Sequence, residues 1–532
     1  MTEPGAEPPT RIAPGPPTPF EGGAGCAVER LDAPRVAVPT AVLDRVRRVG
    51  GTVDVGIEAR TEAGRDWWPL AIGWAASGQV PARPAAVVRP SSGDQVAELL
   101  AACAEERVPV TPMGGRSGVC GGTVPVYGGV ALDCTTLVGE IRLDETSLVA
   151  DVPAGTNGRD LEDTLRATGE GYTLGHWPQS IDLSTVGGWL ACRGAGQYST
   201  RYGKIEDMVA GLEVALAGGR LVRTGARGPR AATGPDLTQL FTGSEGVLGV
   251  ITRAWLRVHP LPSVSDRRAY SFATFEEGLD ACRRVLRRGG TPAVLRLYDP
   301  AESERIYAHP GRAVLVVLDE ADPTLLAATL SLVDGECGRA DRLDDGVVTH
   351  WLATRNDVSA LAPLWRAGIV VDTAEVAGRW ATLPELAREV IGALRSLDGT
   401  IAASAHLSHA YLDGACLYFT FAGRPPGGRT EPSPPSGRGG RPGSMAAASP
   451  DALSAEAYYR RAWDALTGVV TARGAAISHH HGIGLNRGRF LAPALGGAHD
   501  VLVSLKRALD PAGILNPGKL GIPSPFGEVP WP

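Results

Sequence analysis

Apolar positions along this chain follow two periods, one typical of strands and one typical of helices. Ala85–Arg89 and Val108–Thr111 are short apolar runs that favour strands. The segment between them places its apolar residues three and four positions apart, as on one face of a helix, at Val96, Leu99, Leu100 and Cys103. The same periods predict further strands at Val130–Asp133, Ser147–Val152 and Val250–Val258 and a helix at Leu161–Ala167.

A hairpin and a second region extend this pattern. Glu213–Leu216 and Arg220–Arg223 are predicted to pair across an Ala-Gly-Gly turn. Beyond residue 262 strands are predicted at Tyr270–Phe272, Ala293–Tyr298, Ala313–Leu318 and Ala415–Phe421, and helices at Phe275–Arg288, Leu325–Cys337, Pro384–Ser396, Ala455–Ala472 and Asp500–Leu509. We therefore expect an α+β architecture, with a mixed domain over residues 83–262 and an antiparallel sheet with covering helices over residues 263–520.

The remaining segments are interpreted from composition. Residues 1–30 are rich in Pro and Gly and are expected to form a disordered tail without a signal peptide. Residues 31–82 form a predicted N-terminal helical segment, in which Trp67, Trp68 and Trp74 are interpreted as a packed cap. Residues 423–450 have the low complexity of a disordered loop insertion, and residues 521–532 are expected to form a tail.

Charge and cysteine usage narrow the class of protein. The 532 residues include 52 basic and 58 acidic side chains, a net charge of −6 without a dense basic stripe, so nucleic acid is not an expected partner. The eight cysteines are scattered without a CxxC, which argues against a disulfide framework and a zinc module and favours a cytoplasmic location. No apolar run approaches the ~20 residues of a membrane span.

Three Gly-rich segments follow strand-like runs, namely Val108–Gly122, Trp177–Gly196 and Gly234–Thr252. Glycine lets consecutive amides turn toward a ligand and form a nest for an anion, most often a phosphate. One such segment is equally well a surface turn, whereas three in the order P-x-GG, P-x-S-x-x-x-STVGG and GSEG-x-LG-x-IT are specific. Two other phosphate signatures are rejected, because Leu520 ends the P-loop-like run Gly513–Lys519 and Arg116 interrupts a GxGxxG pattern.

With these motifs the chain resembles the flavoproteins that share the FAD-binding, PCMH-type fold of vanillyl-alcohol oxidase, and among them alkyldihydroxyacetonephosphate synthase and its bacterial relatives. The resemblance runs from about Pro84 to Leu520. It implies two FAD-binding subdomains followed by an FAD-linked oxidase C-terminal cap domain. It also implies non-covalent FAD, because Arg116 stands in the loop where covalent-flavin members carry a histidine.

The resemblance implies three sets of cofactor contacts. Those to the pyrophosphate come from Pro112, Met113, Gly114, Gly115, Arg116, Ser117 and Gly118. Those to the isoalloxazine and ribityl chain come from Pro178, Gln179, Ser180, Ile181, Asp182, Leu183, Ser184, Ala191, Cys192, Arg193 and Gly194, and Thr185, Gly187 and Gly188 between them are further cofactor-binding candidates. Those on the adenine side come from Glu245, Gly246, Val247, Leu248, Gly249, Val250 and Ile251.

The run SHHHGIG, residues 478–484, is a second candidate site. Adjacent side chains of an extended segment point to opposite faces, so three consecutive histidines are not expected to bind one ion, and we expect no metal site. A solvated loop is the alternative to a functional cluster. In the synthase family this segment belongs to the active site, which implies catalytic roles for His479, His480 and His481.

Tyr418 and Arg296 are two further candidates. Tyr418 is either a core aromatic or, by resemblance, the proton-transferring tyrosine, and neighbouring histidines or the flavin are expected to lower its pKa from about 10. Arg296 in an apolar strand favours a functional or ion-paired role, and it matches an arginine that the family needs for activity. The phosphate-binding arginine of the family falls at Leu361, and Arg355 or Arg366 are its candidate substitutes.

A related family branch oxidises 2-hydroxy acids with a metal-binding GHxGDGNxH segment. Here His406–Tyr418 corresponds to it, but Ala415 and Cys416 replace the acid and amide, so that metal site is expected to be absent. The leading hypothesis is an FAD enzyme that exchanges the acyl group of acyl-dihydroxyacetone phosphate for a long-chain alcohol, a step of ether lipid synthesis without net redox change.

The alternatives are an FAD-linked oxidoreductase acting on a hydroxy acid or alcohol such as D-lactate or glycolate, and a flavin-binding protein without catalysis. The expected partners are a small-molecule or lipid-like substrate, with peripheral membrane contact if the substrate is a lipid, and a second copy of the chain, since family members often dimerise.

Overall fold

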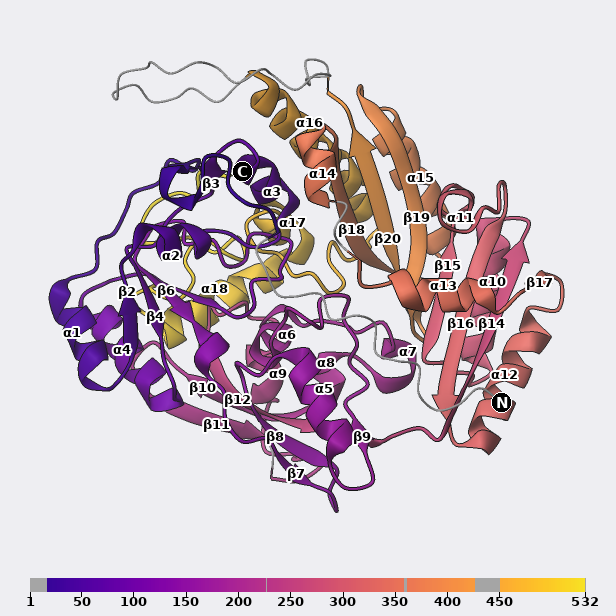
Figure 1. Ribbon diagram of the computed structural model, residues 1–532, viewed down its shortest axis with the longest axis horizontal. Helices are drawn as coiled ribbons and strands as arrows, with labels where there is room; N and C mark the ends of the chain where they lie inside the picture. Colours follow the sequence, from indigo (N-terminus) through magenta and orange to yellow (C-terminus); the bar gives the residue numbers. More distant parts are fainter. Residues whose placement is uncertain (1–16, 226, 358–360, 426–449, 532) are drawn as a thin grey trace.

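The computed structural model describes residues 17–225, 227–357, 361–425 and 450–531. The N-terminal half contains two main sheets, and the second half contains one large sheet beside them (Figure 1). The predicted insertion at residues 423–450 lies outside the described residues except at its two ends.

The two N-terminal sheets form two α+β layers, as predicted. The first has the order β2-β4-β6-β5, with strands Thr52–Asp54 (β2), Ala86–Arg89 (β4), Val110–Met113 (β5) and Val130–Asp133 (β6). The second is antiparallel in the order β11-β10-β12-β8-β7, with strands Arg142–Asp144 (β7), Val149–Pro153 (β8), Val209–Ala215 (β10), Leu221–Gly225 (β11) and Val250–Arg257 (β12). The predicted hairpin is β10–β11, in which Val214 pairs with Val222.

Helix α4 (Gly93–Glu105) links these two sheets. It follows β4 of the first sheet and packs against β10, β11 and β12 of the second. All four of its predicted apolar positions are buried, and the Ser92 hydroxyl caps its first turn by accepting a hydrogen bond from the Gln95 amide. The helical period read from the sequence is therefore confirmed.

The other elements of the N-terminal half are short. Its helices are Ala24–Cys26 (η1), Thr40–Arg48 (α1), Ile57–Glu62 (α2), Pro69–Ala75 (α3), Cys134–Thr136 (η2), Gly158–Ala167 (α5), Val186–Cys192 (α6), Ser199–Tyr202 (α7), Ile205–Met208 (α8) and Leu237–Phe241 (α9). Its remaining strands are Val28–Glu29 (β1), Gln79–Val80 (β3), Tyr172–Thr173 (β9) and His259–Pro260 (β13).

The large sheet of the second half, called the cap sheet below, is antiparallel throughout, as predicted. Its order is β17-β14-β16-β15-β19-β20-β18. The strands are Val264–Phe272 (β14), Val294–Tyr298 (β15), Ala313–Ala321 (β16), Asp341–Leu343 (β17), Val370–Arg379 (β18), Thr400–Ala410 (β19) and Gly414–Gly423 (β20). The pattern of the sequence did not predict β17, β18 or β19.

Helices α10 (Phe275–Arg287), α12 (Pro323–Glu336) and α15 (Leu383–Arg395) pack on the cap sheet. Leu297 of β15 lies against Gly278 of α10. Because side chains alternate along a strand, the adjacent Arg296 points to the opposite face, which is left for the site described below. The remaining helices are Pro300–Tyr307 (α11), Gly346–Thr354 (α13), Leu361–Arg366 (α14), Pro450–Ala472 (α16), Gly488–Leu495 (α17) and Gly497–Leu509 (α18).

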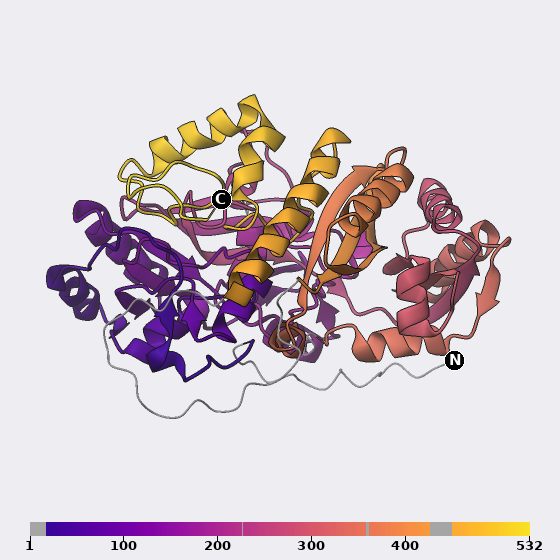
Figure 2. The same cartoon turned by 90° about the horizontal axis from the view of Figure 1, so that it is seen from above.

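Helix α16 and the C-terminal segment connect the two halves. In Figure 2 the gold helix α16 runs between the cap sheet and the N-terminal half, and the yellow C-terminal segment lies on the N-terminal half. The Trp68 indole donates to the Tyr459 hydroxyl of α16 at 2.9 Å, and Tyr459 donates to Asp372 of β18 at 2.5 Å. This chain of hydrogen bonds fixes the predicted tryptophan cap to the second half.

The interpretation of residues 1–30 as a disordered tail is wrong for residues 17–30, and residues 1–16 lie outside the described chain. Phe20 packs beneath the Arg65 guanidinium, 3.8 Å from the ring centroid, and β1 pairs with β3. Residues 31–82 combine α1, α2 and α3 with strands β2 and β3, so this segment is not purely helical. The low apolar content of residues 17–30 concealed contacts that only the folded chain supplies.

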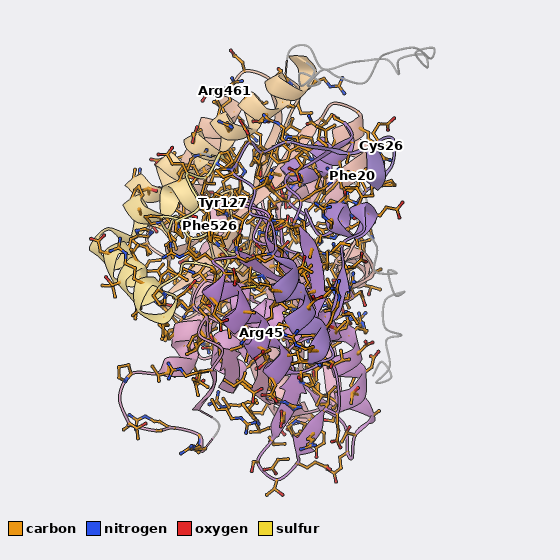
Figure 3. The ribbon with its side chains drawn as sticks, turned by 90° about the vertical axis from the view of Figure 1, so that its left-hand side faces the viewer. Phe20, Cys26, Arg45, Tyr127, Arg461 and Phe526 are labelled. Carbon is orange, nitrogen blue, oxygen red and sulfur yellow. The ribbon has the colours of Figure 1, made fainter. Side chains whose placement is uncertain are left out.

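The C-terminal segment also packs on the N-terminal half. The Trp531 ring lies 5.4 Å from that of Trp68, and the Phe526 ring lies 5.9 Å from that of Tyr127, as Figure 3 shows for the labelled pair. All eight cysteines fall in the described chain and carry free thiols. Among the described helices, none is long and apolar enough to cross a membrane.

His176 is buried in the core next to the second Gly-rich segment, where its ring centroid lies 4.5 Å from that of Trp189. Neither ring nitrogen has a hydrogen-bond partner among the described residues. Burial lowers the pKa of His176 to about 3. Because this value lies below the ~6.5 of an unfolded chain, stability is lost as the pH falls below ~6.5.

We expect His176→Leu to remove this part of the acid sensitivity. Between pH 7.5 and pH 5 the wild-type free energy of unfolding should fall by about 2 kcal/mol more than that of the variant. Urea unfolding at the two pH values measures both, and His350→Leu, at an exposed histidine, is the matched control. Equal losses in the wild type and His176→Leu would contradict the expectation.

Candidate active site

Four consecutive backbone amides of the first Gly-rich segment are unpaired among the described residues. It follows β5, and within the described chain the amides of residues 115–118 donate no hydrogen bond. Arg116 has a left-handed φ of 55°, and its guanidinium donates to the Glu62 carbonyl. Consecutive unpaired amides at the end of a strand form an anion nest, which suits the predicted pyrophosphate contact.

The three Gly-rich segments pack directly on one another. Gly115 of the first segment lies so close to the Leu183 carbonyl of the second that an added Cβ would overlap it. An added Cβ at Gly246 of the third segment would likewise overlap the ring of Pro112. The glycine spacing therefore lets the three backbones approach, as expected for segments that surround one ligand.

Several predicted cofactor residues can offer only backbone atoms. The side chains of Ile181, Val247 and Leu248 are buried in the core. The Asp182 carboxylate is paired with Arg159 at 2.9 Å, and both side chains are buried. The contacts predicted at these positions therefore depend on main-chain geometry.

Glu245 connects the third segment to the histidine segment. Its buried carboxylate accepts hydrogen bonds from the amides of Ile483, at 2.5 Å, and Gly484, at 2.9 Å. The Asn516 side chain donates to the Glu245 carbonyl at 2.7 Å and to the Gly122 carbonyl at 3.1 Å. The Glu245 carboxylate thus holds the chain directly after the three histidines against the N-terminal half.

A β-bulge in β19 brings two histidines to the same face of the cap sheet. His406 pairs with Tyr418, and the register shifts before His409. In a regular strand residues 406 and 409 would point to opposite faces, and the extra residue of the bulge returns His409 to the face of Tyr418. Arg296 lies on this face as well, with Nη2 at 2.8 Å from Nε2 of His406.

Residues 478–481 wrap around the carboxylate of Glu375, which lies in β18 and is fully buried. The amides of residues 479–481 donate to Oε1 at 3.3, 3.2 and 2.8 Å, and the Ser478 hydroxyl donates to it at 2.8 Å. Arg487 donates to both carboxylate oxygens. Three consecutive amides meet at one atom only where the backbone is bent, so the prediction of an extended segment is wrong.

The charge of Glu375 is stabilised by its surroundings. Burial alone would raise the pKa of Glu375, but Arg487 and His481 hold it well below its usual range. The side chains of Glu375 and Arg487 are 0% and 1% exposed, so this ion pair is fully inside the protein. Loss of one partner of such a pair costs about 3–5 kcal/mol, because the other charge is left buried alone.

The bend determines where the three histidine rings point. His479 and His480 meet His409, whose ring centroid lies 4.9 Å from each of theirs, whereas His481 lies beside Tyr418. Burial lowers the pKa of His479 to about 4 and the pKa values of His409 and His480 well below the usual range. These three rings are therefore neutral at physiological pH.

Tyr418 lies in the centre of this face. Its hydroxyl is 3.3 Å from Nε2 of His481 and accepts a hydrogen bond from Thr373 at 3.2 Å. Its ring stacks on His406 with the centroids 5.0 Å apart. Burial raises the pKa of Tyr418, which is opposite to the predicted direction, because a phenolate is unfavourable away from water.

Arg296 carries a charge that no carboxylate neutralises directly within the described chain. Besides His406 it contacts Tyr298, whose hydroxyl accepts from Nε at 3.2 Å. His406 in turn has Nδ1 at 2.8 Å from Oε2 of the buried Glu302. The predicted ion-paired role of Arg296 is thus indirect, through the His406 ring.

The N-terminal half also reaches this cluster. The hydroxyl of Ser199 in α7 lies 2.7 Å from Nδ1 of His409 and 3.3 Å from the Tyr411 hydroxyl. Tyr411 continues the contact to Nε2 of His479 at 3.0 Å. The structure therefore brings all five predicted catalytic residues to one face, next to the three Gly-rich segments.

Sequence reasoning missed several residues of this cluster, namely Ser199, Glu302, Glu375, Tyr411 and Arg487. Only Glu375 left a usable signal, as one of two acids among the apolar residues of VVDTAEVAG. The others lie in segments whose meeting depends on the tertiary fold.

Comparisons with known proteins agree with this geometry. A family model described as an FAD binding domain matches residues 84–225, and one described as the C-terminal domain of FAD linked oxidases matches residues 261–520. The chain is 29% identical over 453 residues to an uncharacterized FAD-linked oxidoreductase of Escherichia coli, YgcU, with 82% of this chain and 89% of that protein covered.

Two alkyldihydroxyacetonephosphate synthases are also similar. The chain is 28% identical over 482 residues to that of Dictyostelium discoideum, covering 83% of this chain and 74% of that protein. A solved synthase structure matches the fold with a TM-score of 0.73 at 23% identity, covering 92% of this chain and 88% of that chain.

The two matched domains define an FAD-dependent enzyme with the PCMH-type fold. More specifically, the chain carries the FAD binding domain and the C-terminal domain of the FAD linked oxidases. FAD is its cofactor, as predicted. The unpaired amides of residues 115–118 and the close approach of three Gly-rich backbones fit a large anionic ligand at this place.

We expect Gly115→Ala to weaken FAD binding by about tenfold or more, because the new methyl group must displace the Leu183 backbone from the first segment. The flavin content after purification and the dissociation constant for added FAD measure the loss. Gly218→Ala is the control, since its Cβ would meet no atom within 4 Å. Equal FAD affinity in the two variants would contradict the proposed role of the segment.

Proposed function

We propose that this enzyme is of the alkyldihydroxyacetonephosphate synthase type and exchanges the acyl group of acyl-dihydroxyacetone phosphate for a long-chain alcohol. In the net reaction the alcohol gives up its hydroxyl proton, a fatty acid leaves, and no electrons are gained or lost overall. The bound flavin supplies an electrophilic ring. The observation that carries the proposal is the Tyr418–His481 pair on the face that meets the flavin-binding segments.

Tyr418 and His481 are proposed to move the proton. Nδ1 of His481 lies 2.9 Å from Oε2 of Glu375, and this acidic neighbour favours a proton on Nδ1. Nε2 is then an acceptor, 3.3 Å from the Tyr418 hydroxyl. A phenol with a raised pKa stays protonated until its proton passes to this nitrogen, after which it can take the proton of the alcohol.

Arg355 is proposed to bind the substrate phosphate. Its guanidinium packs over three rings, those of Trp177, Tyr198 and Trp351. Nε and Nη1 are buried and have no hydrogen-bond partner among the described residues, and Arg296 packs on the same Trp351 ring. Arg366 is the weaker candidate, because it donates to Thr18 at 2.5 Å.

Tyr418→Phe should lower the exchange rate at least about 100-fold while FAD stays bound, because the proton-transferring hydroxyl is lost. The assay follows fatty acid release and ether formation from acyl-dihydroxyacetone phosphate and hexadecanol. Tyr458→Phe is the control, since that buried tyrosine contacts Thr400 instead of the histidines. A Tyr418→Phe enzyme with wild-type turnover would refute the assignment.

Arg355→Gln should raise the KM for acyl-dihydroxyacetone phosphate by about tenfold or more with a smaller change in kcat, because a charge-assisted contact is lost on binding. Arg366→Gln is the matched control and should keep the wild-type KM. If the KM rises only in Arg366→Gln, then Arg366 and not Arg355 binds the substrate phosphate.

The second candidate is an FAD-linked oxidoreductase, which the likeness to YgcU favours. The neutral imidazoles beside Tyr418 are equally suited to accept a proton from a hydroxy acid. Anaerobic addition of D-lactate or glycolate distinguishes the oxidoreductase from the synthase. Bleaching of the flavin band near about 450 nm supports the oxidoreductase, and an unchanged band with fatty acid release supports the synthase.

A further inference from the structure

Three imidazoles from distant parts of the chain converge beside Tyr418. His409 comes from the bulge in β19, and His479 and His480 come from the bend around Glu375. One ring nitrogen of each lies within 4.8 Å of the other two. The centroids of His479 and His480 are 5.1 Å apart, so the three rings form a compact triangle.

Hydroxyl groups contact one particular nitrogen on two of the rings. The Ser199 hydroxyl contacts Nδ1 of His409 at 2.7 Å, which leaves Nε2 for another partner. The Tyr411 hydroxyl contacts Nε2 of His479 at 3.0 Å, so that Nδ1 of His479 faces the His480 ring. Proteins orient metal-ligating histidines by contacts of this kind to the second ring nitrogen.

The facing nitrogens of His479 and His480 are spaced nearly as two ligands of one small cation. Nδ1 of His479 faces Nδ1 of His480 at 2.9 Å. Two nitrogens bound to one tetrahedral Zn²⁺ at about 2.0–2.1 Å lie roughly 3.3 Å apart. If the two rings move apart by a few tenths of an ångström, their nitrogens reach the spacing of two ligands of one ion.

We propose that His409, His479 and His480 bind one divalent transition-metal ion of the zinc type. Three neutral imidazoles are donors that Zn²⁺ and Co²⁺ prefer, and three protein ligands leave a fourth position for a water or substrate oxygen. The ion would lie beside Tyr418, whose ring centroid is 6.1 Å from that of His480, and would polarise an oxygen held there. Of these three ligands, only His409 belongs to the 406–418 segment, and the other two belong to residues 478–484.

The two neighbouring histidines contact other residues, so variants at these positions can serve as controls for the proposed ligands. His406 is held between Glu302 and Arg296, and His481 lies between Glu375 and Tyr418. Metal binding is independent of which reaction the enzyme catalyses. The test therefore reads binding directly and does not depend on turnover.

The experiment uses the full-length, FAD-loaded protein after dialysis against a chelator. It is titrated with CoCl₂ and with ZnCl₂ in a calorimeter, and the ligand-field absorption of bound Co²⁺ is recorded beyond the flavin bands. We expect one ion per chain. His409→Ala and His480→Ala should weaken binding by about 100-fold or more, and Ser199→Ala by about tenfold, since it removes only an orienting contact.

His406→Gln and the surface variant His350→Ala are the controls and should bind as the wild type does. FAD content and circular dichroism establish that each variant is folded. The proposal is overturned if the wild type binds no ion, or if folded His409→Ala and Ser199→Ala both retain wild-type affinity. Loss of binding in His406→Gln alone would also overturn this ligand set.

Discussion

The buried carboxylate of Glu375 is the interaction on which the candidate active site depends. A single charge with no exposure to water is unfavourable unless donors surround it, and here Arg487, Ser478 and three consecutive amides do so. Those amides belong to the three histidines themselves. The carboxylate therefore bends the backbone of residues 479–481, and the bend determines which ring meets Tyr418 and which rings meet His409.

Other buried carboxylates stabilise the same region. Glu245 binds the amides of residues 483 and 484, which places the histidine segment against the flavin-binding half. Asp372, in the same strand as Glu375, accepts hydrogen bonds from Tyr459 and Trp463 of α16. Strand β18 and the turn at Glu245 thus supply acceptors, and segments from elsewhere in the chain are arranged around them. Such a site is organised before substrate arrives, which is the condition under which fixed charges contribute most to catalysis.

The sequence predicted those features that depend on local patterns. The apolar spacing of α4 and the turn of the β10–β11 hairpin identify their elements without reference to the rest of the chain. The three Gly-rich segments could be recognised because glycine is needed wherever backbones approach closely. Strand β19 was not predicted, because TIAASAHLSHA mixes polar and small residues without a clear alternation.

The site itself was only partly accessible from sequence. Tyr418, Arg296 and the three histidines were candidates, but the bulge that turns His409 inward leaves no trace in composition, since one extra residue in a strand looks like any other. The direction of the Tyr418 pKa was predicted wrongly because it depends on the burial of the phenol itself, which only the fold determines. The order of residues 17–30 was not predicted either, because the residues they pack against lie in distant parts of the sequence.

Amide hydrogen exchange at residues 479–481 tests the organising role of Glu375 most directly. In the wild type these three amides should be strongly protected, and in Glu375→Gln they should exchange about 100-fold faster or more, while the amide of Gly484, held by Glu245, keeps its protection. Unchanged protection at all three amides in a folded Glu375→Gln protein would contradict the account.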